Sequence, residues 1–152
     1  MNMLQKIKFA IFAGSILLIS SCKKDVIVPS SPATETTQVY IATLRGSNEV
    51  PSNSSTATGN AILVFDKATK KFTITVNYTG LTATAAHIHR ALAGTNGPVM
   101  FGFVSSIISP IYYPSAVLTA TQEADLTSNL YYVNVHSATA PGGEIRGQLL
   151  RQ

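Results

Sequence analysis

Short stretches of alternating apolar and polar side chains dominate the chain from Val39 onward. In residues 72–78 (FTITVNY), apolar side chains alternate with Thr and Asn, which is typical of a strand with one buried face. Residues Ala61–Phe65 predict a second strand, and Asp66–Lys70 is expected to join the two as a hairpin loop. Further strands are predicted at Val39–Leu44, Ala85–His89, Val99–Val104, Ala116–Thr119, Leu130–His136 and Ile145–Leu150.

One segment, Thr121–Thr127, favours a short helix, with Thr121 as the expected N-cap. Clusters of Gly, Pro, Asn and Ser separate the predicted strands. Many short strands at this spacing indicate an all-β domain. We expect an Ig-like or Greek-key β-sandwich, or a flattened barrel, of about eight strands.

The first residues have the parts of an export signal. Lys6 and Lys8 precede an apolar stretch, Phe9–Ile19, that is too short to span ~30 Å of hydrocarbon as a helix. Residues 1–21 are therefore predicted to be a signal peptide. Ile19–Cys22 resembles the bacterial lipobox, which implies that Cys22 is acylated and becomes the new N-terminus. The alternative is an ordinary secretory signal with an incidental Cys.

We expect three regions: the signal peptide 1–21, a lipidated Cys and flexible tether at 22–38, and a β domain at 39–152. The tether is rich in Pro, Ser and Thr. The lipid on Cys22 implies an exported protein held on a bacterial membrane, with the outer membrane expected and a periplasmic or surface-facing domain. Cys22 is the single Cys of the chain, so neither an internal disulfide nor a thiolate zinc cluster is expected.

The charge of the chain argues against a nucleic-acid partner. The sequence has 11 Lys and Arg and 7 Asp and Glu. Removal of Lys6 and Lys8 with the signal peptide leaves nine basic against seven acidic side chains, a net charge of +2. Nucleic-acid binding needs basic residues clustered on one face, and here they are scattered.

Four stretches of the chain share a further feature; they are Thr43–Pro51, Ala57–Asp66, Thr79–Phe103 and Leu130–Leu149. Each of them resembles part of the CHRD domain, the module first described in chordin. The resemblance runs from about Tyr40 to Leu150, and Arg90 stands where the family usually has Gly. It implies a non-enzymatic binding or structural module at the cell envelope, whose protein or small-molecule partner is unknown.

The three His of the chain, His87, His89 and His136, all lie in those stretches. Strand alternation places them on one sheet face, together with Asn134, Glu144 and Arg146 as neighbours. One hypothesis is therefore a three-His metal site for Cu or Zn, in a metal-binding or metal-dependent redox protein. The structural alternative is that these His only form hydrogen bonds, while Glu144 and Arg146 form an ion pair.

A weaker resemblance is to the copper–zinc superoxide dismutases, in which two His on one strand, a later His and an Arg follow in similar order. The bridging His and the zinc ligands of that family have no counterparts here, so dismutase activity is not predicted. No complete catalytic set is visible in the sequence, which favours a module that is not an enzyme.

Overall fold

A computed structural model describes residues 36–152. The predicted signal peptide, Cys22 and most of the predicted tether lie outside the described residues. Within 36–152, no helix is long and apolar enough to cross a membrane. The elements are β1 (Thr37–Arg45), a 3-10 turn (Gly46–Asn48), β2 (Thr58–Asp66), β3 (Lys71–Thr79), β4 (Ala83–Arg90), β5 (Val99–Gly102), β6 (Ile111–Pro114), α1 (Ala120–Thr127), β7 (Tyr131–Ser137), β8 (Ile145–Gln148) and β9 (Leu150–Arg151).

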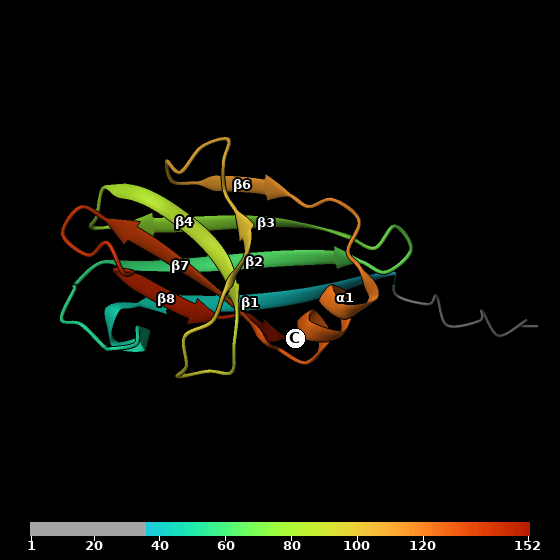
Figure 1. The fold of residues 1–152 in the computed structure, drawn as a ribbon. Coiled ribbons are helices and arrows are strands. Elements are labelled where there is room, and N and C mark those ends of the chain that lie inside the picture. The colour runs from blue at the N-terminus through green and yellow to red at the C-terminus, as the bar shows by residue number, and fades with distance from the viewer. Residues whose placement is uncertain (1–35) are drawn as a thin grey trace, which may run out of the picture. The chain divides into compact units, whose positions relative to one another are not determined.

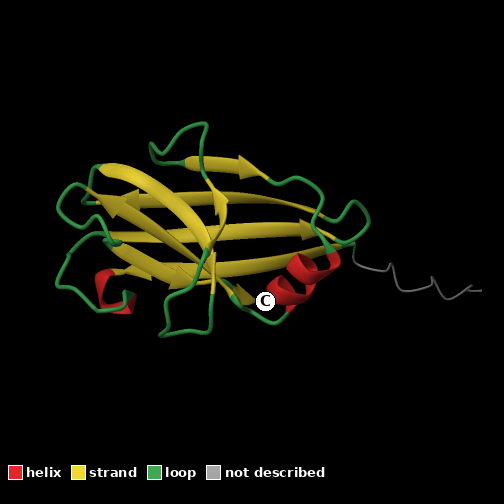
Figure 2. Cartoon of the chain, viewed as in Figure 1, coloured by secondary structure: helices red, strands yellow, loops and turns green. Residues whose placement is uncertain are grey.

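The strands form one antiparallel sheet in the order β5-β4-β7-β8-β1-β2-β3-β6, with β9 paired to β1. The sheet curls, so that β4 and β7 cross in front of β1–β3 (Figure 1). Strands dominate the domain, and α1 is its one α-helix in the described region (Figure 2). The all-β prediction is confirmed, in the form of a flattened, partly open barrel.

The concave side of the curled sheet holds the core. Alternate residues of each long strand point inward, and Leu63, Ile74, Ile88 and Val133 are each 0% exposed. Full burial of a side chain of this size contributes about 1.5–3 kcal/mol to stability. The core therefore joins β2 and β3 at the back to β4 and β7 at the front.

Aromatic side chains close the gap between the two ends of the sheet, β5 and β6. Phe101 of β5 packs edge-on against Phe72 of β3, with ring centroids 5.2 Å apart. Phe103, just after β5, packs against Tyr113 of β6 at 5.3 Å. These contacts replace the strand-to-strand hydrogen bonds that would complete a barrel.

Two local predictions are wrong. Ala116–Thr119 is not a strand, and the strand in this part of the chain is β6, which pairs with β3. The helix cap is Thr119 and not Thr121: the Thr119 side chain accepts from the Gln122 N–H, and the Gln122 side chain accepts from the Thr119 N–H. This reciprocal capping box satisfies two backbone donors at the helix start.

Candidate metal centre

Strand pairing brings the three His together on the outer face of the sheet. His87 and His89 flank the buried Ile88 on β4, so their side chains point away from the core. His136 follows the buried Val135 on β7, the strand that pairs with β4. The structure brings these three predicted His together on one face, with their ring nitrogens close to one another.

The three rings approach closely enough to consider a common ion. One ligand nitrogen from each ring lies within 4.8 Å of the others. Nitrogens around a tetrahedral ion at ~2.0–2.1 Å lie ~3.4 Å apart, so the widest pair must close by ~1.4 Å. One pair, His87 Nδ1 and His136 Nε2, is already at 3.1 Å. The three nitrogens are therefore arranged around a common point, but more widely than the ligands of a bound ion.

Backbone carbonyls fix the orientation of two of the rings. His89 Nδ1 lies 2.9 Å from the Gly97 carbonyl oxygen, and His136 Nδ1 lies 2.9 Å from that of Pro141. A carbonyl can only accept, so each Nδ1 carries the hydrogen and each neutral ring keeps its lone pair on Nε2. Metal-bound His are usually held by this kind of outer hydrogen bond. His89 Nε2 is buried and makes no well-formed hydrogen bond, although the Asn134 side chain interacts with His89 and raises its pKa.

A second set of contacts surrounds His136 Nε2. In the metal-free neutral form it accepts from His87 Nδ1, a hydrogen bond that a shared metal ion would replace, and it also lies 3.0 Å from Asn134 Oδ1. In the neutral tautomer, His136 Nε2 and Asn134 Oδ1 are both acceptors, so their contact is favourable only with a cation or proton between them, or with the Asn amide turned over. Asn134, predicted as a neighbour of the site, thus lies directly beside a ligand atom.

The electrostatic surroundings favour neutral imidazoles. Burial lowers the pKa of His87, and the neighbouring His136 and His89 lower it further. Burial also lowers the pKa of His89, while its hydrogen bond with Gly97 acts in the opposite direction. A metal ion needs the neutral ring, so both lowered pKa values favour the ligand form near neutral pH.

Arg146 reaches the site through a stack of side chains. The Tyr132 ring lies parallel to His89, with centroids 4.9 Å apart, and the Arg146 guanidinium carbon lies 3.3 Å from the Tyr132 centroid. Arg146 also donates to Asn96 Oδ1 and to the Thr95 carbonyl. Arg146 therefore fixes loop 91–98, and the Gly97 carbonyl of this loop orients the His89 ring. Arg146 thus acts on the site as a positioning residue.

Glu144, which was predicted beside the three His, interacts with a different part of the chain. Its Oε1 accepts from Ser55 Oγ at 2.7 Å. The ion pair between Glu144 and Arg146, which belonged to the structural alternative, is not formed: the ion pairs found in residues 36–152 are Lys70–Glu123 and Arg90–Asp125. Glu144 precedes β8 and follows Gly143, whose φ is +130°, so strand alternation does not extend to it.

One buried charged residue near Arg146, Glu49, was not predicted from the sequence. It lies just after the 3-10 turn and is 7% exposed. Burial raises its pKa to about 7, although the nearby Arg146 lowers it. No pattern in the sequence signals this burial, which depends on the docking of two loops.

The comparisons with known proteins gave one result. A family model described as CHRD domain matches residues 40–149. Comparison with curated proteins and with solved structures gave no match. The matched span runs from within β1 to the end of β8 and includes all three His of the candidate site.

Proposed function

The chain belongs to the CHRD domain family, and from this premise we propose that it is a non-enzymatic binding module that holds one transition-metal ion. The ion, copper or zinc, is held by His87, His89 and His136. The observation that carries this proposal is the convergence of three ring nitrogens within 4.8 Å, with two rings oriented by backbone carbonyls.

The buried His89 Nε2, which makes no well-formed hydrogen bond, argues against a purely structural cluster. A buried acceptor without a partner costs about 1–3 kcal/mol, and a cluster that served only the fold would be expected to satisfy it. A metal ion removes this cost by accepting the lone pair. It also separates the two acceptors, His136 Nε2 and Asn134 Oδ1, that lie 3.0 Å apart.

The donor set matches copper and zinc by chemistry. Neutral imidazole suits both ions, whereas magnesium and calcium prefer oxygen ligands. The converging group contains three His and no carboxylate. Three nitrogen ligands leave one coordination position for water or a small ligand.

We propose that the protein acts at the bacterial cell envelope, and this part of the proposal is supported by the sequence of the N-terminal region. The export signal 1–21 and the lipobox-like Ile19–Cys22 favour an acylated, membrane-anchored chain. The tether 22–38 then separates the binding domain from the membrane. We propose an exported protein whose membrane partner is reached through the lipid on Cys22, with the outer membrane as the favoured location.

Elemental analysis tests the metal proposal. The full chain, purified in detergent with a tag that contains no His, is loaded with Cu(II) or Zn(II), desalted and analysed for metal per chain. We expect about one equivalent, with nitrogen splitting in the Cu(II) paramagnetic resonance spectrum. The chain has only three His, so all imidazole ligands come from this site.

Two variants and a control locate the site. His87→Ala and His136→Ala are expected to lose the bound metal, while Tyr112→Ala, an exposed position in β6, retains it. Circular dichroism confirms that each variant is folded. Absence of stoichiometric metal in the loaded wild type refutes the function, and retention of metal in both His variants refutes the site.

A further inference from the structure

Asn134 lies at the centre of the residues that form the candidate metal centre. In the register of β4 and β7, Asn134 is the direct cross-strand partner of His87. His136 follows Asn134 by two residues on the same face of β7, and His89 follows His87 by two residues on β4. Direct and diagonal cross-strand neighbours are within reach of one another. The backbone therefore places the Asn134 side chain next to all three imidazoles.

The contacts of the Asn134 side chain agree with this placement. Its Oδ1 lies 3.0 Å from His136 Nε2, and the same nitrogen lies 3.1 Å from His87 Nδ1. The Asn134 side chain also interacts with the His89 ring, whose Nε2 is buried and makes no well-formed hydrogen bond. Ligand atoms around a tetrahedral ion at ~2.0–2.2 Å lie ~3.3–3.5 Å apart. Two potential ligand atoms thus lie close to this separation from His136 Nε2.

Hydrogen bonds within the cluster do not account for the position of Asn134 Oδ1. The hydrogen of the His136 ring is on Nδ1, which donates to the Pro141 carbonyl, so Nε2 has a lone pair and no hydrogen to offer. If the amide is turned over, its N–H group competes with His87 Nδ1 for that one lone pair. Asn134 is 3% exposed, so solvent compensates little. A cation between the two acceptors satisfies both.

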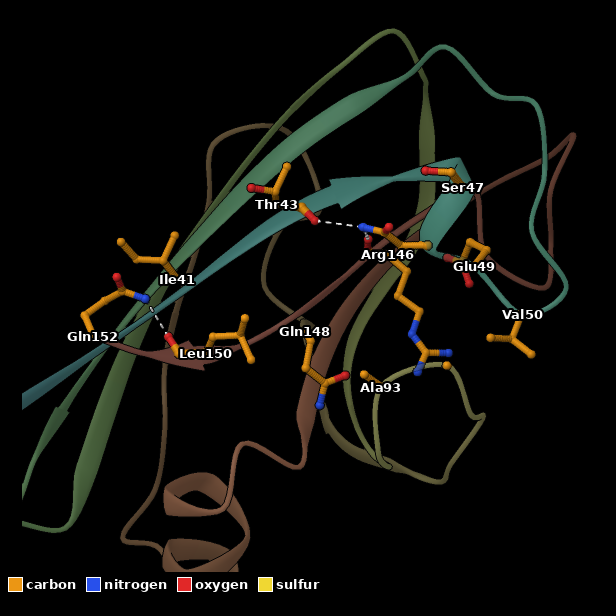
Figure 3. Close-up of a pocket in the computed structure, with 12 residues that line it drawn as sticks. Ile41, Thr43, Ser47, Glu49, Val50, Ala93, Arg146, Gln148, Leu150 and Gln152 are labelled. Atoms are coloured by element: carbon orange, nitrogen blue, oxygen red, sulfur yellow. Dashed lines mark hydrogen bonds between the residues drawn. The ribbon is translucent and has the colours of Figure 1, made fainter.

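Two hollows beside the site show where a competing ligand could come from. The larger, of about 620 Å3, lies over β1, β8 and β9, and Figure 3 shows the Arg146 guanidinium beside Ala93 there. Neither Asn134 nor any of the three His lines it. The second, of about 420 Å3, has His87 in its wall together with residues 102–107. Water from this second hollow is therefore the alternative to Asn134 as a ligand.

We propose that Asn134 is the fourth ligand of the metal ion and binds it through Oδ1, which completes a shell of three imidazole nitrogens and one amide oxygen. This inference rests on the proposed metal function and names the group that takes the remaining coordination position. Asn side-chain carbonyls are known metal ligands, and four donors complete the tetrahedral shell that is usual for zinc. Asn134 then excludes water from that position.

The mixed donor set affects which ion the site prefers. Soft sulfur ligands select Cu(I), whereas imidazole suits zinc and copper, and carbonyl oxygen suits harder divalent ions. A shell of three nitrogens and one oxygen therefore favours Zn(II) and Cu(II) over Cu(I). Removal of the oxygen should raise the Cu(II)/Cu(I) reduction potential, because the divalent state loses a donor that favours it.

Asn134→Asp and Asn134→Leu distinguish a metal ligand from a structural amide. Asp keeps an oxygen in the same place and adds a negative charge beside the ion, whereas Leu has a similar shape and no donor atom. Zn(II) affinity of the full chain in detergent is measured by competition with a chromophoric chelator. We expect Asn134→Leu to bind Zn(II) about tenfold more weakly, and Asn134→Asp at least as tightly as the wild type. An equal loss in both variants, as expected if the amide only donates an N–H, overturns the proposal, and so does wild-type affinity in Asn134→Leu.

The Cu(II) paramagnetic resonance spectrum reports on the ligand atoms directly. We expect the copper hyperfine splitting to change in both Asn134 variants, because the oxygen bound to copper gains charge in one and is lost in the other. Asn60→Asp and Asn60→Leu are matched controls at an exposed position of β2, a strand without His, and should keep the affinity and spectrum of the wild type. Spectra of both Asn134 variants that superimpose on that of the wild type overturn the proposal.

Folding and the proposed metal function are checked separately. Circular dichroism shows whether each variant is folded, and the affinity and spectrum of Asn134→Asp decide the question if Asn134→Leu does not fold. A wild type without stoichiometric metal refutes the metal function and this inference with it. A wild type that holds one ion, with Asn134 variants that match it in affinity and spectrum, refutes the role of Asn134 alone.

Discussion

Replacement of Glu49 by Gln should change how the stability of the domain depends on pH. Glu49 is 7% exposed and its Oε1 has no partner, so its charged form is poorly solvated in the folded state. Burial raises its pKa from 4.5 to about 7, against the opposing influence of Arg146. The folded chain therefore binds this proton more tightly than the unfolded chain does.

The magnitude follows from the two pKa values. Because the folded chain binds the Glu49 proton more tightly, this group contributes its full stabilisation below pH 4.5, and the stabilisation is lost as the pH rises through 7. At 1.36 kcal/mol per pKa unit, the difference corresponds to about 3 kcal/mol. Because Gln cannot ionise, the free energy of unfolding of Glu49→Gln, relative to wild type, should rise by about 3 kcal/mol between pH 4 and pH 8.

Urea unfolding followed by tyrosine fluorescence measures this difference, since the chain has six Tyr and no Trp. The titration runs from pH 4 to pH 8 with a chelator present, and equal m-values confirm that the two proteins expose similar surface on unfolding.

Asp66→Asn is a control whose stability should change with pH in the direction opposite to Glu49→Gln, relative to wild type. Hydrogen bonds from the Ala68 and Thr69 N–H groups lower the pKa of Asp66, so the stability that its carboxylate contributes is lost as the pH falls. A Glu49→Gln difference that stays flat within about 1 kcal/mol, or that falls with rising pH, refutes the reasoning about Glu49.

Three further predictions concern single positions. Thr119→Ala removes the helix cap and should lower the free energy of unfolding by about 1 kcal/mol, while Thr121→Ala should change it by less than half of that. Gly147→Ala places a β-carbon 2.5 Å from a carbonyl oxygen of β1 and should lower the free energy of unfolding by about 1–3 kcal/mol. The control Gly142→Ala meets no atom within 4 Å, and its melting temperature should stay within a degree or two of that of the wild type. Burial lowers the pKa of His89, so the stability that its neutral ring contributes is lost as the pH falls below about 6.5. Between pH 7 and pH 5, the free energy of unfolding of metal-free His89→Gln should therefore fall less than that of the wild type. An identical fall in both proteins would contradict this.

Alternation along β4 and β7 was enough to predict the shared face of His87, His89 and His136. The period of two gives a side chain's face directly, and the pairing of β4 with β7 then brings the rings together. The same rule failed at Glu144, because Gly143 adopts a positive φ and the strand starts only at Ile145. Period-two reasoning holds inside a strand and ends at its boundary.

The remainder of the site depends on loops, which have no periodic signal. The face of Arg146 was predictable, but its partners Thr95 and Asn96 lie about fifty residues away in loop 91–98. Glu49 is buried only because its loop packs near loop 91–98, as the Asn96 hydrogen bond to the Val50 carbonyl shows. Ala116–Thr119 has strand-forming residues, yet it leads into the capped start of α1. Tertiary contacts, more than local propensity, determine the secondary structure of such segments.

The aromatic closure between β5 and β6 also bears on self-association. An unpaired strand edge is a template on which another chain can add a strand, the first step of aggregation. Here the two sheet ends are only four residues long each, and Pro114 of β6 has no N–H to donate. Phe72 and Phe101 hold β5 against the body of the domain at 5.2 Å. The domain thus leaves its sheet open without offering neighbouring copies a continuous edge, which allows many copies to crowd together and remain separate.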